Sequence, residues 1–140
     1  MHAITFQKVR SIRHAEVPDP ELRDPRDAIV QVTLAGLCGS DLHVYHGRET
    51  GIDRGTVMGH ECVGRVVLAG EGVHGLSAGD RVAAPFSTCC GDCYYCAHGL
   101  SARCIAGQLF GWVEKGTGLE GAQASFVRVP LADATLFPLP

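Results

Sequence analysis

Residues 63–85, VGRVVLAGEGVHGLSAGDRVAAP, contain the pattern that decides the fold class. Two short runs within this stretch, residues 63–69 and 81–85, predict strands. Between the two runs lie four glycines that mark turns, because glycine adopts backbone angles that other residues avoid: Gly70, Gly72, Gly75 and Gly79. The stretch therefore predicts two neighbouring strands joined by a glycine-rich connection.

Similar short elements lie on both sides of this stretch. We expect further strands at residues 1–9, 29–35 and 122–129, one short helix at 40–47, and loops between them. Ser40 or Asp41 can cap the start of the helix and Gly47 its end. Many short strands with glycine turns and no long amphipathic helix predict a mainly β fold, either a barrel-like fold or a sandwich.

Composition and charge exclude several classes of protein. The 140 residues fit one domain, and a hydrophobic content of 46% with 19% charged residues excludes intrinsic disorder. The net charge of −3 disfavours binding to nucleic acid. Since no apolar run approaches the ~20 residues of a membrane span and the first residues lack the basic and apolar pattern of a signal peptide, we expect a cytoplasmic protein with no membrane partner.

Four of the seven cysteines follow the pattern Cys90-x2-Cys93-x2-Cys96-x7-Cys104. Short spacers bring three sulfurs together and a longer one returns the fourth, as a structural zinc site with four thiolates requires. One alternative is a pair of disulfides, which a reducing compartment and an odd cysteine count oppose. Another is a DNA-binding zinc ribbon, which usually has two separated C-x2-C pairs and a basic face. Cys89 is an alternative ligand, but Cys90 gives the regular spacing.

A second candidate metal site combines residues from two segments. Cys38 ends a predicted strand, and His60 and Glu61 precede another. One thiolate and one imidazole can share a metal and leave a coordination position open, which is the mark of a catalytic zinc. A lone cysteine at a strand end is more often a small buried apolar residue. The pattern by itself leaves both interpretations open.

The chain carries four motifs in a fixed order: Gly36-Leu37-Cys38-Gly39-Ser40-Asp41-Leu42-His43, Gly59-His60-Glu61, Gly79-Asp80-Arg81-Val82, and the cysteine loop of residues 87–104. A further match covers residues 120–130. Together these motifs resemble the N-terminal, GroES-like domain of zinc-dependent medium-chain alcohol dehydrogenases. The resemblance covers essentially the whole chain. It implies that residues 1–140 form a partly open GroES-like β-barrel with short helices and a zinc-binding cysteine loop.

The resemblance also implies two zinc ions and the roles of their ligands. The structural zinc would bind Cys90, Cys93, Cys96 and Cys104. The catalytic zinc would bind Cys38 and His60, with Glu61 either coordinating or exchanging at the metal. Apart from the resemblance, Glu61 can equally form an ion pair or a hydrogen bond within the domain.

Three residues near Cys38 receive catalytic roles from the same resemblance. Asp41 would accept the imidazole N–H of the ligand histidine and fix its tautomer. Ser40 would hydrogen-bond the substrate oxygen, and His43 would carry the proton onward to water. Asp41 can also cap the helix, and His43 can also be an ordinary exposed histidine. The implied reaction is the oxidation of a small-molecule alcohol to an aldehyde or ketone by hydride transfer to NAD(P).

Two parts of the family pattern lie beyond the matching region: the third protein ligand of the catalytic zinc and the nucleotide-binding domain. Gly-x-Gly-x-x-Gly occurs at residues 70–75 and 116–121, but neither occurrence can open a strand–helix–strand unit. The apolar, proline-rich end at residues 136–140 indicates a truncated polypeptide. We therefore predict no turnover by the isolated chain, and NAD(P) binding only with the missing domain. That domain and a second copy of the chain are the candidate partners.

The competing hypothesis is a non-enzymatic zinc-binding module that has one structural zinc and acts through a protein partner. The two hypotheses differ in whether Cys38 and His60 bind a metal. Other notable residues receive structural roles: Cys62 is expected to be a buried thiol, and Phe110, Trp112 and Phe126 are expected in the core, where near a cleft they can also line a pocket. The remaining five histidines are expected at the surface.

Overall fold

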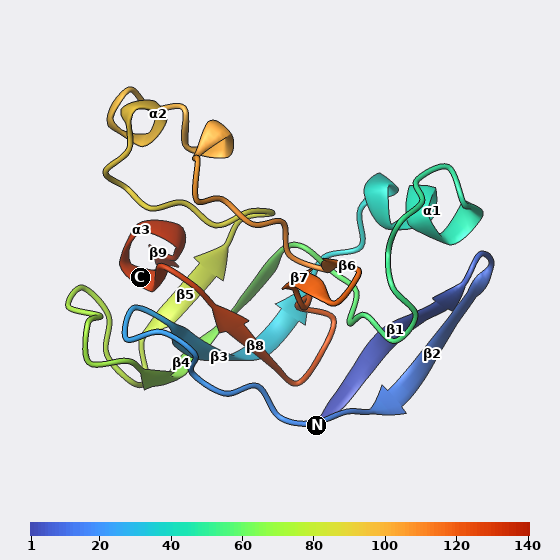
Figure 1. Ribbon diagram of the computed structural model, residues 1–140. Helices are drawn as coiled ribbons and strands as arrows, with labels where there is room; N and C mark the ends of the chain where they lie inside the picture. Colours follow the sequence, from blue (N-terminus) through green and yellow to red (C-terminus); the bar gives the residue numbers. More distant parts are fainter.

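The computed structural model describes all 140 residues and consists of three antiparallel sheets with short helices (Figure 1). The largest sheet has the strand order β8-β3-β4-β5-β9, formed by β3 (Ala28–Ala35), β4 (Cys62–Ala69), β5 (Arg81–Ala84), β8 (Phe126–Val129) and β9 (Phe137–Pro138). Two hairpins accompany it: β1 (His2–Lys8) with β2 (Ser11–Glu16), and β6 (Trp112–Glu114) with β7 (Thr117–Leu119). The sheet ends at β8 and β9 without closing into a barrel, which confirms the mainly β, partly open fold.

The helices are all short. They are α1 (Gly39–His46), α2 (Tyr94–Ala97) and α3 (Ala132–Thr135), with one 3-10 turn at Ser101–Arg103. None of them is long and apolar enough to cross a membrane. The helix expected at residues 40–47 is confirmed as α1. Its first turn is capped by Asp41, whose Oδ2 accepts the Cys38 backbone N–H at 2.8 Å, and Gly47 ends it with a φ of 72°.

The main core lies on the five-stranded sheet. It comprises 14 buried residues, most of them small or β-branched side chains of β3, β4, β5 and β8. Val30, Val66 and Val82 are among those at most 1% exposed, and burying one such side chain contributes about 1.5–3 kcal/mol. Cys62 belongs to this core, as expected, and burial raises the pKa of its thiol to about 11. The sheet is therefore a rigid base for the loops at its ends.

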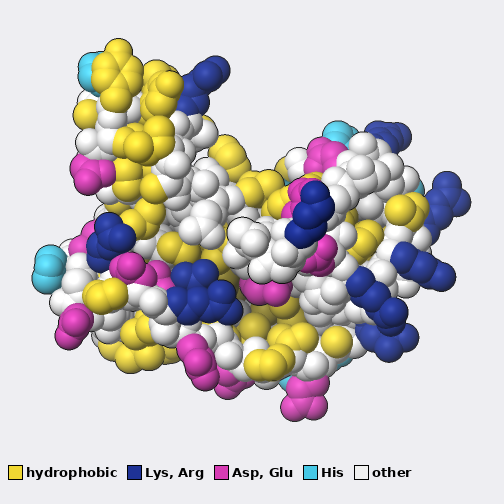
Figure 2. Space-filling view, viewed as in Figure 1, with side chains coloured by type: hydrophobic (Ala, Val, Ile, Leu, Met, Phe, Trp, Pro, Cys, Tyr) yellow, Lys and Arg dark blue, Asp and Glu magenta, His cyan; other side chains and the backbone are white.

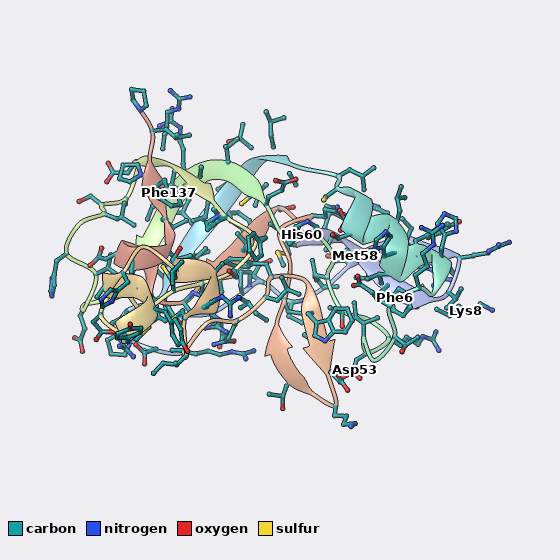
Figure 3. All side chains as sticks on the ribbon, turned by 90° about the horizontal axis from the view of Figure 1, so that it is seen from above. Phe6, Lys8, Asp53, Met58, His60 and Phe137 are labelled. Carbon is teal, nitrogen blue, oxygen red and sulfur yellow. The ribbon has the colours of Figure 1, made fainter.

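The pairing of β3 with β4 explains why two distant segments meet. The two strands are antiparallel, and their last paired residues are Ala35 and Cys62. The chain therefore leaves β3 toward Cys38 at the same end of the sheet at which it enters β4 from His60. A second, smaller core of Phe6, Val44 and Met58 holds α1 near this end of the sheet (Figure 3).

Some predicted elements differ from the structure. The strand expected at 122–129 begins only at Phe126, because residues 121–123 bond to residues 57–59 outside the sheet. The hairpin of β6 and β7 was not predicted, since its turn uses Lys115 and Gly116, both with positive φ, instead of a common Asn-Gly or Asp-Gly pair. The strand β2, the helices α2 and α3 and the short strand β9 were also not predicted.

The remaining expectations can be placed on this fold. The two Gly-x-Gly-x-x-Gly stretches lie in the loop between β4 and β5 and around the β6–β7 hairpin, and no helix follows either. The five remaining histidines are exposed, as expected: His2, His14, His46, His74 and His98. The expected cysteine loop belongs to a projecting segment, residues 89–109, in which no residue is buried (Figure 1). We call this segment the cysteine lobe.

Candidate functional site

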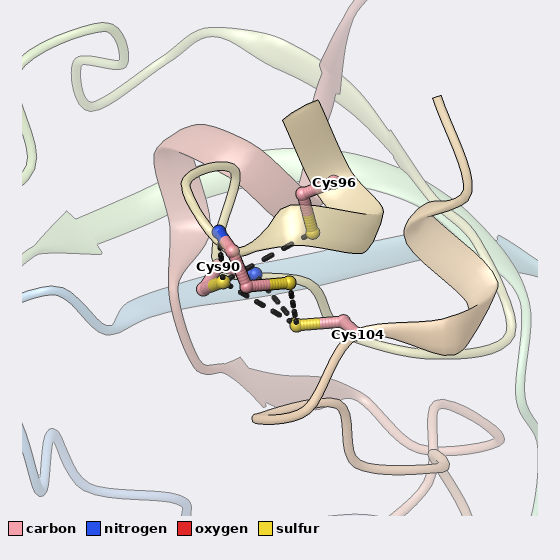
Figure 4. A group of neighbouring side chains, drawn as sticks. Cys90, Cys96 and Cys104 are labelled. Carbon is pink, nitrogen blue, oxygen red and sulfur yellow. Dashed lines mark hydrogen bonds between the residues drawn. The ribbon is translucent and has the colours of Figure 1, made fainter. Parts of the chain in front are cut away.

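The cysteine lobe brings together the four predicted thiols Cys90, Cys93, Cys96 and Cys104 (Figure 4). The Sγ atoms of Cys90 and Cys104 are 3.4 Å apart, and those of Cys90–Cys96 and Cys93–Cys104 are each 4.0 Å apart. These separations exceed a disulfide bond of about 2.0 Å. They lie on either side of the ~3.8 Å expected between two sulfur atoms that bind one zinc ion tetrahedrally with Zn–S bonds of about 2.3 Å. The four free thiols therefore fit a tetrahedral zinc ion.

Local backbone structure creates this arrangement. Cys93 precedes the first turn of α2, and its backbone N–H donates to the Cys90 Sγ at 3.4 Å. The Cys90 N–H in turn donates to the Cys104 Sγ at 3.2 Å. Gly91, with a φ of 80°, makes the tight turn between the first two cysteines. Backbone donors aimed at sulfur favour thiolates, the form that binds a metal.

The pKa values of the four thiols are shifted in different directions. Backbone N–H groups of Cys96 and Ile105 lower the pKa of Cys93 to about 6. The neighbouring Asp92 raises the pKa of Cys90 to about 12. Neighbouring thiolates repel one another, and a divalent cation among them offsets that repulsion.

Cys89, the alternative ligand, lies outside this group. Its Sγ is 3.0 Å from the Ala134 carbonyl oxygen, and its backbone N–H donates to the Thr135 Oγ1 at 3.1 Å. Both contacts are with α3. Cys89 therefore attaches the base of the cysteine lobe to the main body, and it is not one of the four thiols that converge.

The second predicted group, Cys38, His60 and Glu61, also comes together, with ligand atoms within 4.8 Å of one another. The β3–β4 pairing positions both segments, and one further bond extends it, from the Gly36 N–H to the Glu61 carbonyl at 3.0 Å. Cys38 and His60 are half-buried, whereas Glu61 is exposed. One sulfur, one nitrogen and one exposed carboxylate form a donor set that fits zinc and leaves coordination open.

Asp41 touches both partially buried ligand residues. Its side chain is only 6% exposed, and its Oδ1 lies 3.6 Å from the Nδ1 of His60, an ion-pair distance longer than a hydrogen bond. Its other oxygen accepts the Cys38 N–H. The backbone N–H of Ser40 and then the His60 imidazole lower the pKa of the Cys38 thiol. Asp41 thus caps α1 and faces the imidazole at the same time.

A cavity of about 470 Å³ opens beside this group. Ser40, Cys38, His60 and Glu61 line one part of it, with the Ser40 Oγ 3.9 Å from the Cys38 Sγ. The rest of its wall is largely apolar: Val44, Ile52, Met58, Phe86, Leu109, Phe110 and Trp112. Figure 2 shows hydrophobic side chains along the notch between the cysteine lobe and α1, and Figure 3 shows His60 and Met58 beside α1. Phe110 and Trp112, which were expected in the core, therefore also line a pocket.

His43 does not line the cavity. It lies on α1, and its Nδ1 is 3.4 Å from Oε1 of Glu49, which does line the cavity. Glu49 and most of the apolar wall could not be predicted from the sequence, because these residues come from separate segments and share no motif. A larger hollow of about 540 Å³, between the segment after β2 and the β6–β7 hairpin, contains no predicted ligand.

Comparison with known proteins identifies the family. The family model described as the alcohol dehydrogenase GroES-like domain matches residues 24–140. The chain therefore belongs to this family.

Curated relatives and solved structures agree with this assignment. The whole chain aligns with 47% of the length of the medium chain reductase/dehydrogenase ucsI of Acremonium sp, at 46% sequence identity. It aligns with 32% of the length of the zinc-type alcohol dehydrogenase B of Aspergillus flavus, at 44% sequence identity. It superposes on 40% of the alcohol dehydrogenase TADH from Thermus sp. ATN1 with a TM-score of 0.93 and 43% identity. The chain thus spans between a third and a half of these proteins.

Proposed function

We propose that the chain is the zinc-binding catalytic domain of an oxidoreductase that converts alcohols to aldehydes or ketones by hydride transfer to NAD(P). One observation carries this proposal: Cys38, His60 and Glu61 converge at a cavity that Ser40 also lines. The nucleotide would be held by a domain outside these 140 residues, since the relatives are two to three times longer.

Each residue at the cavity has a proposed task. Cys38 and His60 would hold a zinc ion, with Glu61 as an exchangeable ligand. When bound, zinc supplies a Lewis acid that polarises an alcohol oxygen and favours loss of its proton. Ser40 would orient that oxygen by a hydrogen bond, and Asp41 would keep the imidazole in one orientation.

His43 would carry the released proton to the surface. Its half-exposed imidazole lies against Glu49, and the two side chains are 46% and 47% exposed. Glu49 lines the cavity, so the pair joins the cavity to bulk water. A histidine suits this task because its imidazole can both accept and release a proton.

The lining of the cavity favours uncharged substrates. Its wall is mainly apolar, and its ionised side chains, Asp41, Glu49 and Glu61, are all acidic. A small neutral alcohol or aldehyde would bury apolar surface against this wall. Seven free thiols suit a reducing compartment, so we also propose a cytoplasmic location.

The non-enzymatic alternative gives no reason for the second ligand group. A module with a zinc ion only in the cysteine lobe needs neither the Cys38–His60 pair nor the acid that faces His60. The two relatives and the solved structure reported above are named as dehydrogenases or alcohol dehydrogenases. The catalytic-domain proposal accounts for both groups.

A chimera tests the proposed function. The chain would replace the matching 40% of the Thermus alcohol dehydrogenase, and reduction of NAD or NADP by alcohols would be followed by absorbance. We expect turnover by the chimera, none by the isolated chain, and none by the chimera carrying Cys38→Ser. Turnover by the isolated chain would contradict its predicted dependence on the missing domain. A folded, zinc-loaded chimera without turnover would contradict the catalytic role.

A further inference from the structure

We propose that Gln123 is a positioning residue that fixes the distance between Cys38 and His60. This inference rests on the proposed function, because it concerns the same pair of metal ligands. The Gln123 side chain is half-buried and belongs to neither ligand-bearing segment. It contacts both segments, one on each side of the pair.

On the first side, Gln123 is bound to the segment that leads into His60. The Gln123 backbone N–H donates to the Met58 carbonyl at 2.8 Å, and the adjacent Ala122 N–H donates to the Gly59 carbonyl at 3.0 Å. A Cβ atom at Gly59 would lie 2.5 Å from the Gln123 Cγ. The stem of the Gln123 side chain therefore packs directly on the residue that precedes His60.

On the second side, the end of the same side chain reaches the segment that leads into Cys38. The Gln123 Nε2 donates to the Gly36 carbonyl at 3.2 Å. The Gly36 N–H already donates to the Glu61 carbonyl. Both backbone groups of Gly36 are thus satisfied just beyond Ala35, where regular β3–β4 pairing ends. Without the Gln123 amide, one of these two restraints is lost.

The side chain and the backbone of Gln123 have separable tasks. Its backbone carbonyl accepts the Ile4 N–H at 2.8 Å and joins this segment to β1. Any substitution other than proline can keep these backbone bonds. Gln123→Met retains an unbranched stem of similar length and removes only the donor to Gly36. The variant therefore isolates the positioning role from the general role of the segment in the fold.

Cobalt(II) titration of the full chain tests this role. Cobalt gives different absorption bands with four thiolates and with a mixed sulfur–nitrogen set, so the cysteine lobe serves as an internal standard. We expect Gln123→Met to weaken cobalt binding at the Cys38–His60 site by roughly tenfold, the effect of one net hydrogen bond. Binding at the cysteine lobe should stay unchanged. Gln31→Met is the matched control, because Gln31 is exposed on β3.

The outcomes separate the two claims. Equal affinities of wild type and Gln123→Met for cobalt at the mixed site would overturn the role of Gln123 and leave the proposed function intact. Equal weakening at both sites, or by Gln31→Met as well, would show a general loss of stability and would also overturn it. A wild-type chain with only the four-thiolate bands would overturn the proposed catalytic site and this inference together.

Discussion

The two candidate metal groups are built in opposite ways. The cysteine lobe takes its four thiols from a single stretch of 15 residues, 90–104, and contains no buried residue. The Cys38–His60 group takes its ligands from two separate segments, which the pairing of β3 with β4 on a core of 14 buried residues brings together. From this comparison we expect a metal ion to stabilise the lobe, whereas the fold itself positions the second group.

The largest expected effect follows from removing a thiol of the lobe. Cys104→Ser should abolish metal binding in the cysteine lobe, because it removes one of the four ligands. The lobe then loses the stabilisation that a structural zinc site supplies, on the order of 10 kcal/mol, and nothing else in the lobe replaces it. Hydrogen exchange should then rise across residues 89–109 and remain slow in the main sheet. Cys89→Ser is the control and should keep its zinc. Loss of protection throughout the sheet would contradict the local role of the metal.

The next effect concerns Gly59, whose φ is 93°. A Cβ there would meet the Gln123 backbone nitrogen at 2.7 Å. We expect Gly59→Ala to lower the free energy of unfolding by about 3 kcal/mol and to remove metal from the Cys38–His60 group. Gly55→Ala separates strain from clash, since Gly55 has a φ of 94° and open space around its α-carbon. Chemical denaturation of both variants should give a clearly smaller loss for Gly55→Ala, and equal losses would exclude the clash.

A smaller and more selective effect is expected for Asp41→Asn. Asparagine still caps α1 by accepting the Cys38 N–H, but it removes the charge that faces His60. Zinc affinity at that group should fall about 10- to 100-fold, as for other partners of metal ligands. Competition with a chelator would measure this, and the cysteine lobe should retain its affinity. Unchanged zinc affinity at both groups would show that Asp41 has no role in metal binding.

The smallest effect is a pH dependence. Burial raises the pKa of Glu120 above its ordinary value of 4.5, although the carboxylate accepts the Val57 N–H. Because the folded pKa is the higher one, this contribution to stability is complete below pH 4.5 and is lost as pH rises through the folded pKa. Glu120→Gln should remove this pH dependence. The free energy of unfolding of the wild type, relative to that of the variant, should therefore decrease as pH rises from 4.5 through the folded pKa of Glu120. A constant difference in denaturation midpoints from pH 4 to 7 would contradict the assignment.

The sequence predicted those parts of the molecule whose cause is local. Strands with regular apolar residues, the helix capped by Asp41 and the spaced cysteines could all be predicted, because each depends on neighbours in the chain. The apolar wall and Glu49 could not, since they converge only through tertiary packing. The strand expected at 122–129 was too long for the same reason. Residues 121–123 follow a nonlocal bond pattern with residues 57–59, and local patterning cannot encode it.

Native mass spectrometry of the zinc-loaded chain, with Cys38→Ser beside it, tests the central claim that this domain holds two separate metals. We predict two zinc ions per wild-type chain and one per Cys38→Ser chain, with the seven cysteines of the wild type and the six of the variant all reduced. The ion that remains in the variant should be the one in the cysteine lobe. A single zinc ion in both chains would contradict the claim, because the Cys38–His60 group would then bind no metal.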